Sequence, residues 1–260
     1  MSSEVKSVAP YDAIAPFYDR MYHNELSGRA GEAALVGALT DRFLPSTHSV
    51  LDLGSGTGTV LNQLAQTIIL EDMVGVEQSA KMIHQARQNV PEAEFIQGDI
   101  TDFDLGRQFD LVTCLFDTIN HIPEPTGWER VFEQAAKHLK PGGIFMFDMA
   151  TPYLLQGITQ QDGYNWDFDG GRANLTMREV SPYQYKGEVE VITDDAPSET
   201  ATLHITEATF DPRLVIRSLK KYLNPVRAFD YNKAVEMGDG QLPKVTEETA
   251  KIMIVSQKDV

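Results

Sequence analysis

Cysteine is almost absent from the sequence: Cys114 is the single one among 260 residues. A lone thiol excludes an internal disulfide and cannot by itself form a thiolate metal site. Cys114 lies in the apolar run 109–116, FDLVTCLF, where a buried and inert side chain is expected. The sequence therefore predicts no metal site, and it fits a reducing, cytoplasmic compartment.

Long apolar runs and basic clusters are also missing. No stretch approaches the roughly 18 apolar residues of a membrane span, and the first residues lack the basic and apolar blocks of a secretory signal. The chain has 22 Lys and Arg against 38 Asp and Glu, a formal net charge of −16. Because phosphate backbones are held mainly by Lys and Arg, we expect no nucleic acid and no membrane as partner, and a small or cationic acceptor fits better.

The first half of the chain alternates strand-like and helix-like patterns, and its length suits one large domain or a domain with an insertion. Apolar runs predict strands at 49–54, 73–77, 93–99, 109–116 and 144–149. Amphipathic patterns between them predict helices at 57–67, 79–90 and 125–140. Strictly alternating strands and helices are typical of a parallel sheet covered on both faces.

After Thr151 the pattern changes to a period of two. The runs 173–180, 187–193 and 201–210 alternate apolar and polar residues, which predicts antiparallel strands with one wet face. A helix at 212–223 and strands at 227–232 and 250–257 follow. We therefore predict four parts, namely an N-terminal helical lid at 1–45, an α/β core at 46–154, an inserted β segment at 155–211, and a closing helix and strands at 212–260.

Three glycines follow the first predicted strand at two-residue intervals, Gly54, Gly56 and Gly58. The dinucleotide fingerprint G-x-G-x-x-G would need a glycine where Thr59 stands, so the turn departs from that pattern. With Asp52 two residues ahead, the turn resembles motif I of the class I S-adenosylmethionine-dependent methyltransferases. The phrase LKPGGIFMFD, before and within the fifth predicted strand, is also typical of that family.

The resemblance implies a Rossmann-like, doubly wound seven-stranded α/β sheet with S-adenosylmethionine as cofactor. Glu77, at the end of the second strand, would accept hydrogen bonds from both ribose hydroxyls, and such charge-assisted bonds are strong. Asp99 would accept from the adenine amino group, and Ile100 and Met82 would flank the ring. The full cofactor-binding set that we expect is Tyr18, Asp52, Gly54, Ser55, Gly56, Glu77, Gln78, Met82, Asp99, Ile100 and Leu115.

The fourth strand runs into the segment CLFDTINHI, and in this fold its carboxyl end faces the methyl group. The candidate catalytic residues are therefore Asp117, Asn120 and His121. His121 is either a general base, since histidine titrates near neutrality, or a residue that orients the loop. Asn120 can equally fix the turn, and Asp117 can attract a cationic amine or bond to nearby amides.

Aromatic residues outside the core motifs are candidates for the acceptor side. Tyr11 and Tyr18 resemble the tyrosine-bearing helix that folds over the donor in related enzymes and excludes water. Tyr164 and Trp166, together with Tyr11, are the acceptor-binding residues that we expect, and the two in the insertion would wall the pocket or cage a cation. The alternative is that these rings form the core of a small sheet.

The sequence thus predicts methyl transfer from S-adenosylmethionine to nitrogen or oxygen of a small molecule. A protein or tRNA methyltransferase is an alternative, which the acidic composition disfavours. A methyltransferase-like domain that binds without catalysis is a second alternative, and a nicotinamide oxidoreductase is a distant third. A homodimer is left open.

Overall fold

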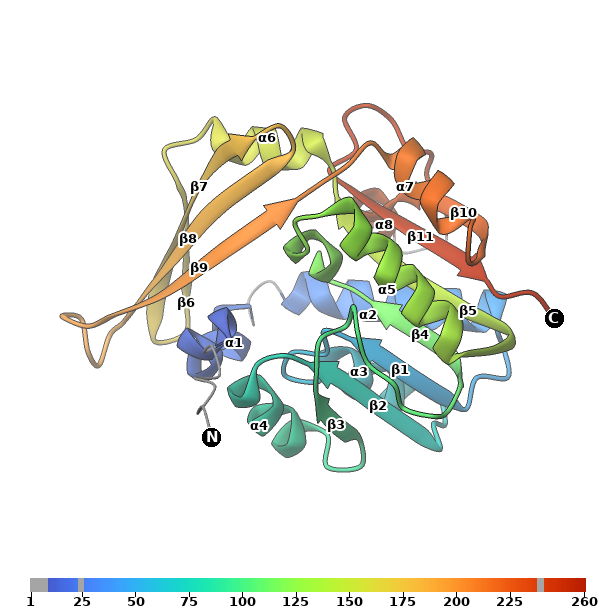
Figure 1. Ribbon diagram of the computed structural model, residues 1–260. Helices are drawn as coiled ribbons and strands as arrows, with labels where there is room; N and C mark the ends of the chain where they lie inside the picture. Colours follow the sequence, from blue (N-terminus) through green and yellow to red (C-terminus); the bar gives the residue numbers. More distant parts are fainter. Residues whose placement is uncertain (1–8, 23–25, 238–240) are drawn as a thin grey trace, which may run out of the picture.

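The computed structural model describes residues 9–22, 26–237 and 241–260. Its centre is a seven-stranded sheet in the order β10-β11-β5-β4-β1-β2-β3, and a four-stranded sheet, β6-β7-β8-β9, extends to one side (Figure 1). The predicted α/β fold with an inserted antiparallel segment is confirmed. Of the N-terminal part predicted at 1–45, residues 1–8 and 23–25 lie outside the described residues.

The seven-stranded sheet is parallel from β3 to β5, and β11 runs antiparallel to both of its neighbours. The carboxyl ends of β1 to β4 therefore meet at one edge, which is where ligands bind in open sheets of this kind. The strands are β1 (Ser49–Leu53), β2 (Asp72–Glu77), β3 (Glu94–Gln97), β4 (Phe109–Cys114), β5 (Leu139–Ala150), β10 (Asn224–Asp230) and β11 (Lys251–Gln257).

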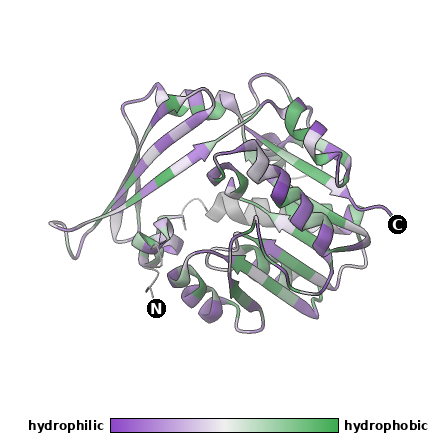
Figure 2. Ribbon diagram, viewed as in Figure 1, coloured by the Kyte–Doolittle hydropathy of each residue, from purple (hydrophilic) through white to green (hydrophobic). Residues whose placement is uncertain are grey.

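Helices cover both faces of this sheet. One apolar cluster joins it to α5 and α7, and a second joins its other face to α2, α3, α4 and α8. Figure 2 shows apolar residues concentrated in the central strands and polar residues on the exposed parts of α4 and α5. The larger helices are α2 (Leu26–Phe43), α3 (Thr59–Thr67), α4 (Ala80–Asn89), α5 (Pro125–His138), α7 (Pro212–Leu219) and α8 (Tyr231–Met237). None of the described helices has the length and apolarity needed to cross a membrane.

The insertion and the N-terminal segment pack on each other. The insertion begins with α6 (Pro152–Thr159) and continues as β6 (Tyr164–Phe168), β7 (Gly171–Ser181), β8 (Gln184–Thr193) and β9 (Thr200–Ala208). An apolar cluster joins this sheet to η1 (Pro10–Ala13) and α1 (Ala15–Met21). In Figure 1, α1 lies between the four-stranded sheet and α4. Neither β6 nor α6 nor α8 was expected from the sequence.

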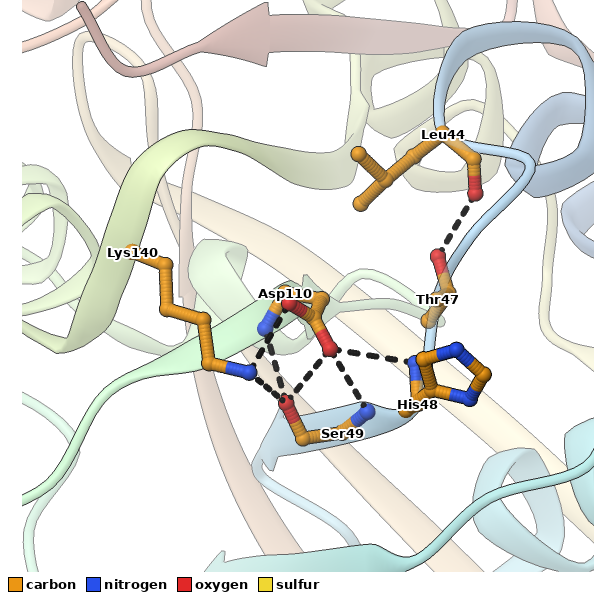
Figure 3. Close-up of polar contacts among 6 residues, drawn as sticks. All are labelled: Leu44, Thr47, His48, Ser49, Asp110 and Lys140. Atoms are coloured by element: carbon orange, nitrogen blue, oxygen red, sulfur yellow. Dashed lines mark hydrogen bonds and ion pairs between the residues drawn. The ribbon is translucent and has the colours of Figure 1, made fainter. Parts of the chain in front are cut away.

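A polar network fastens the amino ends of the central strands, opposite the edge where ligands bind. The Asp110 carboxylate accepts from the backbone N–H of His48 and Ser49, from the Ser49 hydroxyl at 2.8 Å, and from Lys140 Nζ at 2.9 Å (Figure 3). Desolvation raises the pKa of Asp110, but the hydrogen bonds from Lys140, Ser49 and His48 outweigh it and hold the pKa below its ordinary 3.8. One side chain thus joins β1, β4 and β5.

Replacing Asp110 by Ala should destabilise the protein by about 1–3 kcal/mol, because several partly buried donors lose their acceptor. Urea unfolding at neutral pH measures this loss. A carboxyl group whose pKa is lowered by folding stabilises the folded state at pH values above its ordinary pKa, and this stabilisation is lost at lower pH. The difference in free energy of unfolding between wild type and Asp110→Ala should therefore become smaller as the pH falls below 3.8. Asp104→Ala, which removes an exposed ion pair with Lys137, should cost less; an equal loss contradicts the assignment.

Candidate active site

A cavity of about 440 Å³ opens at the carboxyl edge of the sheet. The ends of β1 to β4 line one side, and the N-terminal segment, β9 and the loop around η2 (Thr118–His121) line the other. Every residue that the sequence predicted for cofactor binding lines this cavity, namely Tyr18, Asp52, Gly54, Ser55, Gly56, Glu77, Gln78, Met82, Asp99, Ile100 and Leu115. His121 and Tyr11 line it as well.

The backbone of the turn after β1 explains its glycines. Gly54 has φ +72°, and a Cβ there would lie 2.3 Å from Thr118 Cγ2, so both conformation and space exclude a side chain. Gly56 has φ +53°, and a Cβ there would meet no atom within 4 Å. The bare backbone at Gly56 therefore faces open space, which leaves room for close approach of a ligand.

The Glu77 carboxylate is held by backbone amides on two sides. Its Oε2 accepts from Gly56 N at 3.1 Å, and its Oε1 accepts from Ser79 N at 2.8 Å. Desolvation raises the pKa of Glu77, and the bonds from Ser79 and Gly56 act against that shift. Because a carboxylate offers about four acceptor positions, both oxygens keep the capacity to accept further bonds from a ligand.

A second buried carboxylate and an unsatisfied hydroxyl lie at the start of the glycine turn. Asp52 is 2% exposed, and its Oδ1 accepts from Thr113 Oγ1 at 2.7 Å. Desolvation by burial raises the pKa of Asp52 to about 7, against the lowering effect of the Thr113 bond. Ser55 Oγ is buried without a hydrogen-bond partner among the described residues. This end of the cavity is therefore suited to a ligand that is cationic and polar.

On the opposite side, His121 and Tyr11 form a pair. Tyr11 Oη lies 2.9 Å from His121 Nε2. Desolvation lowers the pKa of His121 from 6.5, although a backbone hydrogen bond to Thr206 opposes the shift. Burial also raises the pKa of Tyr11 well above 10, so the hydroxyl keeps its proton and donates it to the neutral imidazole. The pair offers a proton acceptor at the cavity wall.

Asp117 and Asn120 do not line the cavity. Phe116 and Asp117 have φ of +61° and +59°, a strained turn for residues with side chains. Asp117 forms an ion pair with Lys251 at 2.6 Å. Asn120 is fully buried; it donates to the carbonyls of Ala150 and Ala208 and accepts from Ala150 N. These bonds hold η2, and with it His121, in position.

Tyr164 and Trp166 also lie apart from the cavity lining. Trp166 Nε1 donates to the Met21 carbonyl at 3.2 Å, and its ring packs against Tyr22 and Tyr164 at centroid distances of 6.3 and 5.7 Å. Tyr164 is 49% exposed. The two side chains thus join β6 to the end of α1, and a direct contact with the acceptor stays a prediction.

The sequence reasoning missed several polar residues of the cavity wall, among them two from β9 and one from α5. His204 and Thr206 come from β9, and Arg130 comes from α5. The period of two in 201–210 places His204 and Thr206 on one face of the strand, which was a usable signal once that face was known to point inward. Nothing in the local pattern of α5 distinguishes Arg130 from a solvated residue of an amphipathic helix.

Comparisons with known proteins fit this geometry. The model of the methyltransferase domain family matches residues 50–143. The dTDP-3-amino-3,6-dideoxy-alpha-D-glucopyranose N,N-dimethyltransferase of Streptomyces fradiae is 36% identical over 135 residues, which are 52% of this chain and 52% of that protein. The match thus spans about half the length of this curated relative.

Solved structures resemble the chain over nearly its whole length. An S-adenosylmethionine-dependent methyltransferase from Clostridium acetobutylicum has a TM-score of 0.78 at 20% identity, covering 97% of this chain and 100% of the other. An amino pentose methyltransferase from Micromonospora echinaspora, solved with S-adenosylmethionine bound, has a TM-score of 0.68 at 18% identity and covers 99% and 100%.

The chain therefore has the fold of the class I S-adenosylmethionine-dependent methyltransferases, as the sequence resemblance implied. Within that fold, residues 50–143 match the model of the methyltransferase domain family.

The electrostatics of His121 can be measured without a ligand. Because desolvation outweighs the attraction of nearby carboxylates, the imidazole should titrate below 6.5 in an NMR experiment on the C–H resonances. His121→Asn identifies the signal by its loss. A midpoint for His121 at or above the ordinary pKa of 6.5 would contradict the assignment.

Proposed function

We propose that this protein transfers a methyl group from S-adenosylmethionine to an amine nitrogen of a small molecule. The observation that carries the proposal is one cavity with two chemically different sides. Glu77 and Asp99 lie on one side with the glycine turn, and the His121–Tyr11 pair lies on the other. The first side suits a cationic nucleoside, and the second suits an acceptor that must lose a proton.

The residues of the first side fit the donor. Burial raises the pKa of Asp52 and Glu77, and a cation bound beside these carboxyl groups would favour their charged form. The Ser55 hydroxyl has no hydrogen-bond partner within the described part of the chain, and open space lies beside Gly56, so a polar ligand would find room and bonding capacity there. When bound there, S-adenosylmethionine supplies an activated methyl group on a sulfonium, so no basic cluster is required.

The chain's own contribution is placement and proton removal. Tyr11 and Tyr18 line the cavity from the N-terminal segment and exclude water. A protonated acceptor nitrogen would give its proton to Tyr11 Oη, while the Tyr11 hydroxyl gives its own proton to His121 Nε2. Tyr11 then remains neutral, and His121 becomes positively charged. Holding the reactants in line supplies much of the rate in reactions of this type.

A small amino compound is the acceptor class that we favour. The Streptomyces fradiae relative is named for an amino sugar acceptor, and the amino pentose methyltransferase is a structural neighbour. A net charge of −16 weighs against a nucleic acid acceptor. Cys114 is a buried free thiol, which supports a reducing cytoplasm as its location.

Donor binding is the first test. Calorimetric titration should show that S-adenosylmethionine binds, and Glu77→Ala should weaken binding by about 1.5–3 kcal/mol because one charged acceptor is lost. Glu71→Ala is the matched control, since this exposed carboxylate precedes the opposite end of β2. Unchanged affinity in Glu77→Ala contradicts the carboxylate's role, and binding of NADH in place of S-adenosylmethionine overturns the proposed function.

Turnover is the second test, with dTDP-3-amino-3,6-dideoxyglucose as the first acceptor. His121→Ala should lower kcat by about 10²-fold, the lower end for general acid–base catalysis, while leaving donor affinity unchanged. Tyr11→Phe, which removes only the hydroxyl, should lower kcat in the same direction. A wild-type rate in His121→Ala excludes this residue as the base. Donor binding without turnover of any amine would favour the non-catalytic alternative.

A further inference from the structure

The segment Pro10–Tyr22, which we call the tyrosine segment, places two tyrosines at the cavity and an aspartate next to each. Tyr11 and Tyr18 line the cavity, and Asp12 and Asp19 follow them in sequence. Neither aspartate lines the cavity; each instead bonds to a different part of the α/β core.

Asp12 is bonded to the start of α4. Its Oδ1 accepts from Ser79 Oγ at 2.5 Å and from Lys81 N at 3.2 Å. Ser79 is the N-cap of α4, and its own N–H donates to Glu77 at 2.8 Å. An acidic group at a helix N-terminus is favoured by the free N–H groups there. Asp12 is thereby linked, through one residue, to the carboxylate proposed to hold the donor's ribose.

Asp19 is bonded to the glycine turn. Its Oδ1 accepts from Thr57 Oγ1 at 2.6 Å, and its Oδ2 accepts from Asn89 Nδ2 at 3.1 Å. Asn89 also donates to the Thr57 carbonyl at 3.0 Å, which closes a small network. Thr57 is 1% exposed and directly follows Gly56. Asp19 is therefore linked to the other backbone segment that contacts Glu77.

A further set of contacts joins the tyrosine segment to the insertion. Ile14 and Met21 pack in the apolar cluster of the four-stranded sheet, and Trp166 donates to the Met21 carbonyl. Apolar packing thus attaches the segment to the insertion, whereas the two aspartates set its position relative to the donor-binding turns. The polar contacts decide where Tyr11 meets His121.

We propose that Asp12 and Asp19 are positioning residues that couple the order of the tyrosine segment to occupation of the donor site. The inference rests on the proposed function for the identity of the donor. A ligand held by Glu77 steadies Ser79 and Gly56, which steadies the partners of both aspartates. By reciprocity, a segment that is docked on those partners strengthens donor binding by the same factor.

The experiment compares Asp12→Ala, Asp19→Ala and the double variant with wild type. Asp162→Ala is the matched control, because Asp162 is an exposed aspartate between α6 and β6. Asp12→Asn is the conservative variant: both bonds of Asp12 end on one oxygen, Oδ1, which an amide retains. Calorimetry with S-adenosylhomocysteine gives the affinity, and amide hydrogen exchange over 10–22 reports the order of the segment.

In wild type, S-adenosylhomocysteine should slow exchange across residues 10–22. In the double alanine variant, the dissociation constant of S-adenosylhomocysteine should be about tenfold or more above that of wild type, within the usual range of coupling between sites. The double substitution should also abolish the ligand-dependent slowing while the exchange of β4 and β5 stays unchanged. Asp12→Asn should keep most of the wild-type affinity. In the alanine variants kcat should also fall at saturating donor, because Tyr11 is no longer held at His121.

Two results separate the failure of this proposal from that of the proposed function. If wild type binds S-adenosylhomocysteine and the double variant binds it equally well with the same slowing of exchange, the positioning role is wrong and the function stands. If wild type does not bind S-adenosylhomocysteine, the proposed function is wrong, and the proposed coupling between the tyrosine segment and the donor site is wrong as well. A double variant that exchanges faster throughout β4 and β5 has lost general stability, which contradicts a role specific to the segment.

Discussion

Two backbone amides on a single carboxylate set the geometry of the whole site. Glu77 accepts from Gly56 on one side and from Ser79 on the other, so one side chain joins the turn after β1 to the start of α4. A buried charge needs such donors, because desolvation otherwise drives it toward the neutral form. The N-terminal segment is bonded to the same region: Asp12 accepts from the Ser79 hydroxyl, and Asp19 accepts from Thr57, which follows Gly56. The acceptor side is thus positioned relative to the donor side.

The core and the donor side could be predicted because their signals are local in sequence. The resemblance to class I methyltransferases assigned Asp52, Glu77 and Asp99, which lie in or after successive predicted strands. Because the carboxyl ends of parallel strands meet at one edge, these residues could be grouped without knowledge of any long-range contact. The glycine spacing marked the turn after β1, in which Gly54 and Gly56 both have positive φ. The start of β5 was misjudged: the helix was predicted to end at 140, but β5 begins at Leu139, which pairs with Phe109 of β4.

The acceptor side could not be predicted in the same way because its geometry depends on distant contacts. Asp117 and Asn120 are neighbours of His121 in sequence, yet Asp117 pairs with Lys251 and Asn120 bonds to two strand ends. The residues that meet His121, Tyr11 and Thr206, are 110 and 85 positions away by their numbers. β6 was missed because its exposed and half-exposed residues lack the alternation that marks a strand with one buried face.

The hydrogen bonds of Asn120 limit which parts of such a protein can change during evolution. All of its bonds go to main-chain groups, the carbonyls of Ala150 and Ala208 and the N–H of Ala150, where the insertion leaves and rejoins the core. Main-chain partners are supplied by almost any amino acid. Side chains of the intervening strands can therefore be substituted without loss of the bonds between Asn120 and the two ends of the insertion. The insertion can change in sequence, and with it the acceptor that it would bind, while its attachment to the core stays the same.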